Sequence, residues 1–289
     1  MSFLGARPPG ALPPGGLAVY GVPYDRTASF RRGSRFGPEA IRWASDSIET
    51  YSPLLDRDLD DVPFVDAGDL DVGGLDPEAM VGAIRRQLPP CMPLVLGGEH
   101  TITLGVVQAL TPRYPDLAVI QWDAHTDLRD EYEGRRIAHA TVMRRLVDGG
   151  VPLAQLGIRA GTRAEFEFAR TRTLCCTRDV SVPAEVLARL EGRPLYLTVD
   201  IDVLDPSEAP GTGNPEPMGA TYRGLLDALR GLASQKIVGM DLVEVAPNWD
   251  STGRTAVLAA SLVREMILLS APSRVHNPTS SEPSSLPFG

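Results

Sequence analysis

Three side chains of a type that binds metal ions occupy every second position in the segment 121–127. Asp123, His125 and Asp127 come after the apolar run Leu117–Ile120, which is typical of a buried strand. Where such a strand gives way to a loop, alternate side chains can converge on one point. Carboxylate oxygens with one imidazole suit a hard or borderline divalent ion. Taken alone, the segment is a moderate indication, because a capping Asp or a hydrogen-bonded structural His leaves the same pattern.

Two other apolar runs end in residues of the same kind. His100 follows the run Pro93–Leu96, and Asp200 and Asp202 follow the run Leu195–Val199. In open parallel sheets ligands bind outside the carboxyl ends of the strands, so we expect the three strand ends to form one shared site. Six Asp and His side chains suit two metal ions, which share carboxylates and lower the pKa of a bound water toward neutrality. Because no thiolate is among them, manganese is favoured over zinc.

The four histidines of the chain are concentrated in this region. His100 and His125 belong to the motifs, His139 follows closely, and only His276 lies in the C-terminal tail. His139 has no potential metal ligand two or four residues further on. It is therefore either a structural contact at a helix start or an unligated proton donor beside the metal site.

Further carboxylates stand at or near the predicted strand ends. Glu244 follows the apolar run Ile237–Val243 and is well placed to bind a planar cation; the alternative is a surface or helix-start charge. Glu99 precedes His100, and it either orients a metal ligand or faces the dipole of the helix expected to follow. Asp241 lies inside the Ile237–Val243 run, where burial is unfavourable unless the carboxylate is paired.

These motifs resemble those of the ureohydrolase family, which comprises arginases and agmatinases, and several uncommon strings occur in the family's order. The similarity extends from residue 17 to residue 269, give or take a few positions. The strings are Gly21–Asp25, Gly37–Arg42, Gly97–His100, Asp123–Asp127, Asp200–Pro206, Ala209–Gly213 and Met240–Glu244 with Pro247.

Two segments look more like agmatinases than arginases. The string His139–Arg145 stands where arginases carry a Ser-Gly-Asn segment that holds the amino-acid end of arginine. Pro215–Pro217 is similar to a Pro-Glu-Pro string common in agmatinases, although Met218 stands where a glycine is usual. The resemblance implies hydrolysis of agmatine to urea and putrescine, a reaction of polyamine biosynthesis. Guanidinobutyrate and arginine stay open as alternative substrates.

The resemblance also implies how the site works. One manganese ion would be held by His100, Asp123, Asp127 and Asp200, and a second by Asp123, His125, Asp200 and Asp202. A hydroxide bridging the two ions would attack the guanidinium carbon, oriented by a hydrogen bond to Asp127. Glu244 would bind the guanidinium, and His139 would give a proton to the leaving amine. Asp205, at the end of its motif, is expected to form a turn.

Two other classes of function compete with this one. A metal-dependent deacylase on a related fold would use one zinc ion and a different acid–base set, and the complete two-metal set argues against it. A non-catalytic metal-binding regulatory protein would usually lack one of the ligands, and none is missing here. The sequence therefore predicts a metal-dependent amidinohydrolase of the agmatinase type.

The elements that must position these residues alternate between strands and helices. Such alternation predicts a parallel sheet covered by helices on both faces, and the resemblance implies the three-layer α/β/α fold of arginases. The motifs of one site extend from residue 97 to 244, so a single domain over residues 1–289 is expected. Residues 1–16 and 270–289, rich in Pro with Gly or Ser, are expected to be loose or draped on the surface. The resemblance also implies a homo-oligomer, a trimer or a hexamer.

Composition bounds the partners and the compartment. A net charge of −9 argues against nucleic acid and anionic membrane surfaces, and it is compatible with a small cationic guanidino substrate. No apolar run approaches the roughly 18 residues of a membrane span, and the N-terminus lacks the charged-then-apolar order of a secretory signal. Cys91, Cys175 and Cys176 form no metal-binding pattern, and their odd number indicates a reducing compartment, the cytoplasm.

Two charged loops have no firm role at this level. The segment 25–37 carries four arginines among Gly and Ser, and a solvated or interface-facing position is favoured over a role in substrate binding. The loop 128–137 follows the central motif directly, where a substrate-binding lip would be, but its residues are not assigned.

Overall fold

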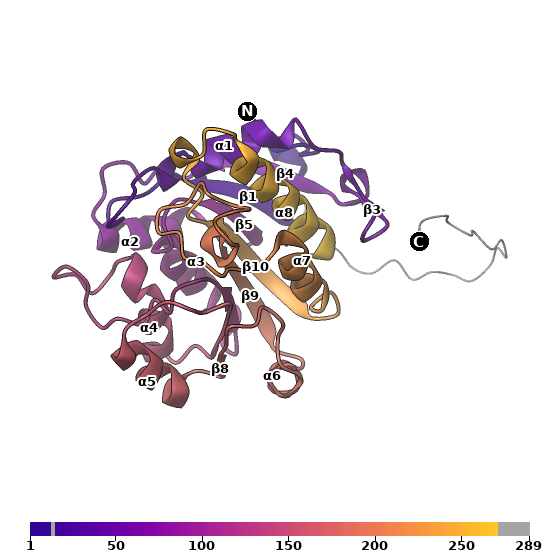
Figure 1. The fold of residues 1–289 in the computed structure, drawn as a ribbon. Helices are drawn as coiled ribbons and strands as arrows, with labels where there is room; N and C mark the ends of the chain where they lie inside the picture. Colours follow the sequence, from indigo (N-terminus) through magenta and orange to yellow (C-terminus); the bar gives the residue numbers. More distant parts are fainter. Residues whose placement is uncertain (13–14, 271–289) are drawn as a thin grey trace.

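The computed structural model describes residues 1–12 and 15–270. A parallel sheet of eight strands runs through this part in the spatial order β4-β1-β5-β10-β9-β6-β7-β8 (Figure 1). The strands of this sheet are β1 (Leu17–Val22), β4 (Phe64–Asp69), β5 (Met92–Gly97), β6 (Ala118–Trp122), β7 (Leu153–Leu156), β8 (Cys175–Cys176), β9 (Pro194–Asp200) and β10 (Lys236–Val243). A separate antiparallel pair is formed by β2 (Tyr51–Ser52) and β3 (Arg57–Asp58).

Helices cover both faces of the sheet, and each face has its own apolar core. Residues of α1 (Gly37–Ser45), α6 (Ala184–Leu190), α7 (Tyr222–Arg230) and α8 (Arg254–Ser270) belong to one core. Residues of α2 (Pro77–Gln87), α3 (Ile102–Leu110), α4 (Val142–Asp148) and α5 (Arg163–Arg172) belong to the other. Successive strand residues alternate between the cores, with Leu94 in the first and Val95 in the second. The predicted three-layer α/β/α architecture is therefore confirmed.

Short 3-10 helices interrupt the connections. They are η1 (Pro9–Ala11), η2 (Ser34–Phe36), η3 (Leu59–Asp61), η4 (His139–Thr141), η5 (Ile201–Val203) and η6 (Pro247–Trp249). In the part of the chain that the structure describes, no helix combines the length and apolarity needed to cross a bilayer.

Four neighbouring strands in the middle of the sheet carry the motifs. They are β5, β10, β9 and β6, and their register brings their carboxyl ends level. Val243, the residue before Glu244, pairs with Asp200, and Trp122, the residue before Asp123, pairs with Val199. Since all four strands run in the same direction, side chains that follow them in sequence emerge at the same edge of the sheet.

The N-terminal segment is held against the edge strand β4 where the structure describes it. Phe3 is buried, packs edge-to-face on Phe64 with ring centroids 6.4 Å apart, and donates its backbone N–H to Asp66. This part is therefore wrapped on the domain and not loose. Of the C-terminal segment, only Ser270, the last residue of α8, is described; the expectation for 271–289 concerns residues outside the described part.

Candidate metal centre and active site

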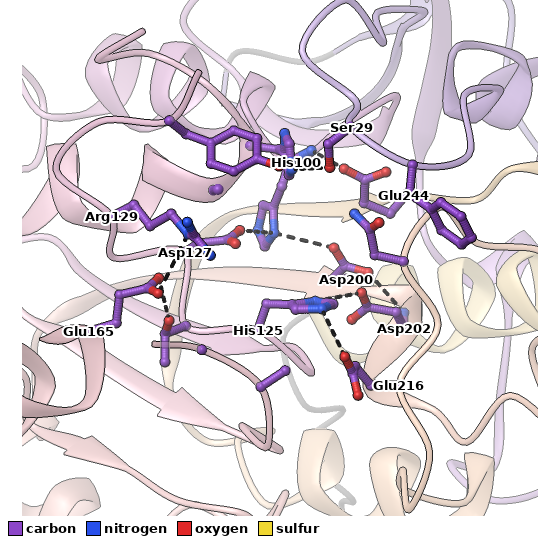
Figure 2. Close-up of a pocket in the computed structure, with 18 of the residues that line it drawn as sticks. Ser29, His100, His125, Asp127, Arg129, Glu165, Asp200, Asp202, Glu216 and Glu244 are labelled. Atoms are coloured by element: carbon purple, nitrogen blue, oxygen red, sulfur yellow. Dashed lines mark hydrogen bonds and ion pairs between the residues drawn. The ribbon is translucent and has the colours of Figure 1, made fainter. Parts of the chain in front are cut away.

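A cavity of about 490 Å³ opens over the carboxyl ends of the four central strands (Figure 2). Eight residues were assigned a metal-binding, catalytic or substrate-binding role from the sequence, and seven of them line the cavity, namely His100, His125, Asp127, His139, Asp200, Asp202 and Glu244. The eighth, Asp123, is fully buried and contacts both His100 and His125. The structure thus brings together side chains that are up to 144 positions apart in the chain.

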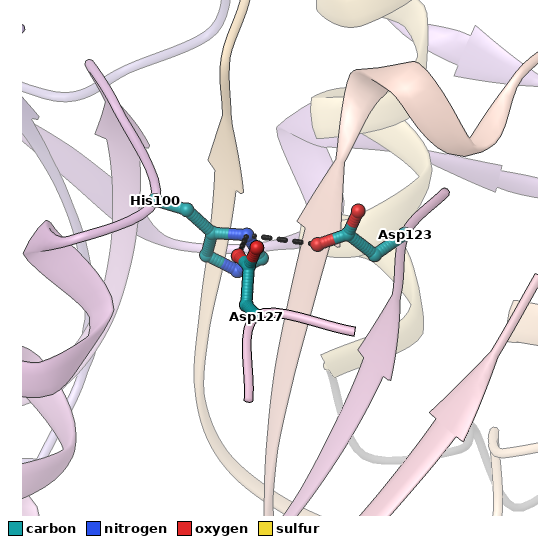
Figure 3. A group of neighbouring side chains, drawn as sticks. All are labelled: His100, Asp123 and Asp127. Carbon is teal, nitrogen blue, oxygen red and sulfur yellow. Dashed lines mark ion pairs between the residues drawn. The ribbon is translucent and has the colours of Figure 1, made fainter. Parts of the chain in front are cut away.

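His100 presents one ring nitrogen to three carboxylates. Its Nδ1 lies 3.0 Å from Asp123 Oδ2, 3.3 Å from Asp127 Oδ2 and 3.4 Å from Asp200 Oδ2. Figure 3 shows the first two carboxylates converging on the ring. This nitrogen is buried and makes no hydrogen bond of ordinary geometry. A buried nitrogen that faces oxygen atoms without such a bond is the arrangement expected of a metal ligand.

His125 forms the second group of donors. Its Nδ1 lies 2.9 Å from Asp202 Oδ2 and 3.5 Å from Asp123 Oδ1. Because Asp123 uses one oxygen toward His125 and the other toward His100, it belongs to both groups. Carboxylate and imidazole donors without a thiolate fit hard and borderline divalent ions. The residues present therefore fit two adjacent metal positions that share a carboxylate.

The charges of these groups favour a cation. Burial, then the neighbouring Asp202 and Asp123, raise the pKa of Asp200 well above its usual range. Burial by itself lowers the pKa of His100, but the surrounding carboxylates together outweigh burial and raise it well above its usual range. Several carboxylates buried at close range repel one another, so the free protein holds protons here that a divalent cation would replace.

Backbone geometry around the site is unusual at two of its residues. Asp127 and Glu244 have positive φ values of 51° and 64°, which are uncommon for residues with a Cβ and concentrate at functional sites. The Glu244 N–H donates to the carbonyl of Gly98 at 2.8 Å, and Glu244 Oε1 accepts from the N–H of His100 at 2.9 Å. Gly98 is required here, since a Cβ at this position would lie 1.9 Å from the carbonyl oxygen of Tyr24.

His139 sits at the start of η4 among hydroxyl groups. The backbone N–H of His139 donates to Thr27 Oγ1 at 3.0 Å. In the ring, Nδ1 lies 3.3 Å from that same oxygen and Nε2 lies 3.4 Å from Ser29 Oγ. Tyr132 packs edge-to-face on the ring at 5.3 Å. Burial, then the positive charge of His125, lower the pKa of His139 to about 4, so the free imidazole is neutral at neutral pH.

The segment 25–37 reaches into the site, and the preference for a solvated or interface-facing role was wrong for part of it. Thr27 is buried and donates to Glu99 through both its hydroxyl, at 2.6 Å, and its backbone N–H, at 2.8 Å. Ser29 and Phe30 line the cavity. Glu99 was expected either to orient a metal ligand or to face a helix dipole. Its hydrogen bonds fit an orienting role, but the residue that it orients is Thr27, which is not a predicted metal ligand.

Two other expectations concerned loops. Asp205 accepts from the N–H groups of Ser207 and Gly219, both at 3.0 Å, and so forms the expected turn.

The loop 128–137 contributes Arg129 and Tyr132 to the lining of the cavity. The Arg129 guanidinium stacks on the Tyr132 ring.

A buried polar group behind His100 was not predicted. His100 Nε2 lies 2.8 Å from the hydroxyl of Thr198 in β9. Next to Thr198, Asp241 in β10 accepts hydrogen bonds from Tyr196 at 2.6 Å and Thr103 at 2.7 Å. Burial raises the pKa of Asp241, and a hydrogen bond from Thr198 is among the contacts that lower it. A Thr198 hydroxyl turned toward Asp241 must accept from His100 Nε2–H, which leaves the Nδ1 lone pair facing the carboxylates.

Replacing Thr198 with Val should weaken Mn²⁺ binding about 10- to 100-fold, the usual effect of removing the partner that orients a metal-binding histidine. The isosteric side chain keeps the packing but leaves the buried Nε2–H without an acceptor. Titration with Mn²⁺, followed by the electron paramagnetic resonance signal of the free ion, measures the affinity. Thr103→Val is the matched control, because the Thr103 hydroxyl donates to Asp241, while its only hydrogen bond to His100 in the described structure joins the two backbones and does not involve the imidazole. Equal affinities for the two variants would contradict this role of Thr198.

Comparisons with known proteins agree with this geometry. Residues 16–269 match the sequence model described as the arginase family. The chain is 45% identical to an agmatinase from Bacillus anthracis, covering 87% of this chain and 91% of that protein. It is 42% identical to an N(1)-aminopropylagmatine ureohydrolase from Thermococcus kodakarensis, covering 79% and 82%. The crystal structure of an agmatine ureohydrolase from Thermoplasma volcanium superimposes with a TM-score of 0.81 at 32% identity, covering 93% and 94%.

Proposed function

Because this chain belongs to the arginase family and is a metal-dependent amidinohydrolase, we propose that it hydrolyses agmatine to urea and putrescine at a pair of manganese ions. The observation that carries the proposal is the pair of His and Asp groups that share Asp123 beneath one cavity. The choice of agmatine is supported by the agmatinase-like string at His139–Arg145 and by the name of the Bacillus relative.

The six donors divide between the two ions in the way that the family resemblance implies. His100, Asp123, Asp127 and Asp200 would hold one ion, and Asp123, His125, Asp200 and Asp202 would hold the other. When bound, the ions supply a water whose lowered pKa makes it a nucleophile near neutral pH.

Glu244 binds the guanidinium of the substrate. Burial, then the charge of Glu99, raise the pKa of Glu244 to about 8, so this carboxyl is poised to gain a cationic partner. One of its oxygens accepts from the His100 N–H, which fixes the direction of the other. A planar guanidinium beside it forms charge-assisted hydrogen bonds and favours the ionised carboxylate.

Asp127 and His139 handle protons. Asp127 accepts a hydrogen bond from the attacking water and orients it toward the guanidinium carbon. His139 is neutral in the free protein, so its imidazole first gains a proton released by that water and then gives a proton to the leaving amine. Without this proton the amine is a poor leaving group.

The test is to strip the protein with a chelator, add Mn²⁺, and measure urea from agmatine, arginine and guanidinobutyrate side by side. We expect urea from agmatine, dependent on the added metal. Urea from arginine alone or from guanidinobutyrate alone would support the proposed type of reaction but would show that agmatine is not the substrate. No urea from any of them would favour the alternative of a non-catalytic metal-binding regulatory protein.

We further propose that the protein is cytoplasmic and works as a homo-oligomer. The three cysteines are free, in accord with a reducing compartment. Trp43 on α1 is 67% exposed and Phe36 is 44% exposed, and both line one surface pocket, an apolar neighbourhood of the kind that subunit interfaces use. Light scattering of the purified protein measures the number of subunits.

A further inference from the structure

Glu216 differs from the other carboxylates that line the cavity. The others are engaged: Asp127, Asp200 and Asp202 face the two histidines, Glu165 accepts from Thr126 and Thr162, and Glu244 accepts from His100. The side chain of Glu216 is 40% exposed, and within the described residues its nearest basic group is His125 Nε2 at 4.0 Å. That distance is beyond a direct hydrogen bond. Figure 2 shows Glu216 on the side of the cavity where His125 lies.

The loop that carries Glu216 is held rigidly. Pro215 and Pro217 flank it and restrict its backbone. Arg159, just beyond β7, donates to the carbonyls of Glu216 at 2.9 Å and Pro217 at 3.0 Å. The same guanidinium donates to the carbonyl of Asp202 at 2.7 Å, which ties the loop to a predicted metal ligand. The backbone of Glu216 is therefore held in place before any substrate binds, which lowers the entropic cost of using its side chain.

The positive charge on this part of the cavity wall is already compensated. Arg129 is the one Arg or Lys residue among the lining residues. Its Nε lies 3.7 Å from Glu165 Oε2, and its guanidinium stacks 5.1 Å from the centre of the Tyr132 ring. Within the described structure, Arg159, which holds the Glu216 loop, donates its hydrogen bonds to backbone carbonyls and forms no salt bridge with the Glu216 carboxylate. Among the described residues, no Arg or Lys side chain therefore compensates the charge of Glu216.

We propose that Glu216 binds an ammonium group at the end of the substrate opposite the guanidinium. This inference rests on the proposed function, in which Glu244 binds the guanidinium end. The inference favours guanidinoalkylamines over guanidino acids as substrates. A substrate carboxylate at that end would be repelled by Glu216, and Arg129, which could attract it, already pairs with Glu165. The competing role for Glu216 is to orient His125 through a bridging water.

The experiment compares Glu216→Gln with the wild type, both loaded with Mn²⁺, on three substrates with the same guanidinium. Agmatine ends in an ammonium, 1-butylguanidine ends in a methyl group, and 4-guanidinobutyrate ends in a carboxylate. We expect kcat/KM to fall roughly 10- to 30-fold for agmatine, the effect of losing one hydrogen bond to a charged group. It should stay within about twofold for 1-butylguanidine and rise for 4-guanidinobutyrate, since removal of a charge acts only on a charged partner.

Glu191→Gln is the matched control, because Glu191 is exposed and lies just before β9 begins, at the edge of the sheet opposite the cavity. An equal fall for all three substrates, with a lower Mn²⁺ content, would overturn the proposal in favour of orientation of His125. Unchanged values for all three would overturn it as well. If the wild type releases urea only from 4-guanidinobutyrate, the substrate class is wrong; if it releases none from any substrate, the proposed function itself fails, and this inference with it.

Discussion

Replacing Asp123 with Asn is expected to abolish Mn²⁺ binding and to lower urea release by on the order of 10³-fold or more, the scale of losing a metal's stabilisation of transition-state charge. Asp123 is the residue common to both donor groups, with Oδ2 3.0 Å from His100 Nδ1 and Oδ1 3.5 Å from His125 Nδ1. Asn replaces one of these oxygens with an NH₂ group that cannot ligate a metal. It also removes the negative charge that both ions would share.

The fold should survive this change. Asp123 is one of the charges that raise the pKa of Asp200, so the buried carboxylates repel one another in the metal-free protein. Burial alone would raise the pKa of Asp123, but hydrogen bonds and charges from His100 and His125 lower it, so the ionised Asp123 itself stabilises the fold. We therefore expect the metal-free variant to melt at a lower temperature than the metal-free wild type, but still in one cooperative transition. Thermal unfolding monitored by circular dichroism checks this.

Metal content after desalting, measured by mass spectrometry, gives the decisive number. Asp205→Asn is the control, because Asp205 forms a turn and contacts neither histidine. We expect the control to keep two manganese ions per subunit and the Asp123 variant to hold none tightly. An Asp123→Asn protein that keeps both ions and full activity would show that the site is assigned to the wrong residues.

The parts of the site that the sequence revealed share one physical reason. Apolar runs mark buried strands, and in a parallel sheet the residue that follows each run emerges at the same edge. That rule identified His100, Asp123 and Asp200 without any knowledge of which strands are neighbours. It also placed Glu244 after the run that became β10, the strand lying between β5 and β9.

The residues that escaped prediction act through contacts that leave no local trace. Threonine is common in strands, so nothing in the sequence distinguishes Thr198 from an ordinary strand residue or indicates its contact with His100. Thr27 reaches Glu99 across 72 positions of the chain, so nothing in its own segment indicates burial. Arg159 holds the Glu216 loop by donating to backbone carbonyls, which every residue possesses and which therefore carry no sequence pattern. The strand β8 spans two residues, too few for any periodicity to appear.

His139→Ala tests the proton transfer, and we expect kcat to fall about 10²- to 10³-fold while both ions stay bound. The imidazole stands between the hydroxyls of Thr27 and Ser29, and its contacts in the described structure are with these groups and Tyr132. It therefore lies beside the predicted ligands without joining either donor group. A loss of manganese in this variant would identify His139 as a ligand and contradict its role with protons.

Slow turnover alone would not distinguish a proton donor from a residue that shapes the cavity, so the leaving amine has to be varied. An amine of low basicity departs without being protonated first, whereas putrescine does not. If His139 supplies that proton, the loss caused by His139→Ala should be large for agmatine and should shrink for 2,2,2-trifluoroethylguanidine, whose leaving amine is much less basic. A loss of the same size for both substrates would mean that His139 shapes the cavity and does not supply the proton to the leaving amine. Because both substrates present the same guanidinium to Glu244 and the metal ligands, the comparison separates proton transfer from binding at that end of the site.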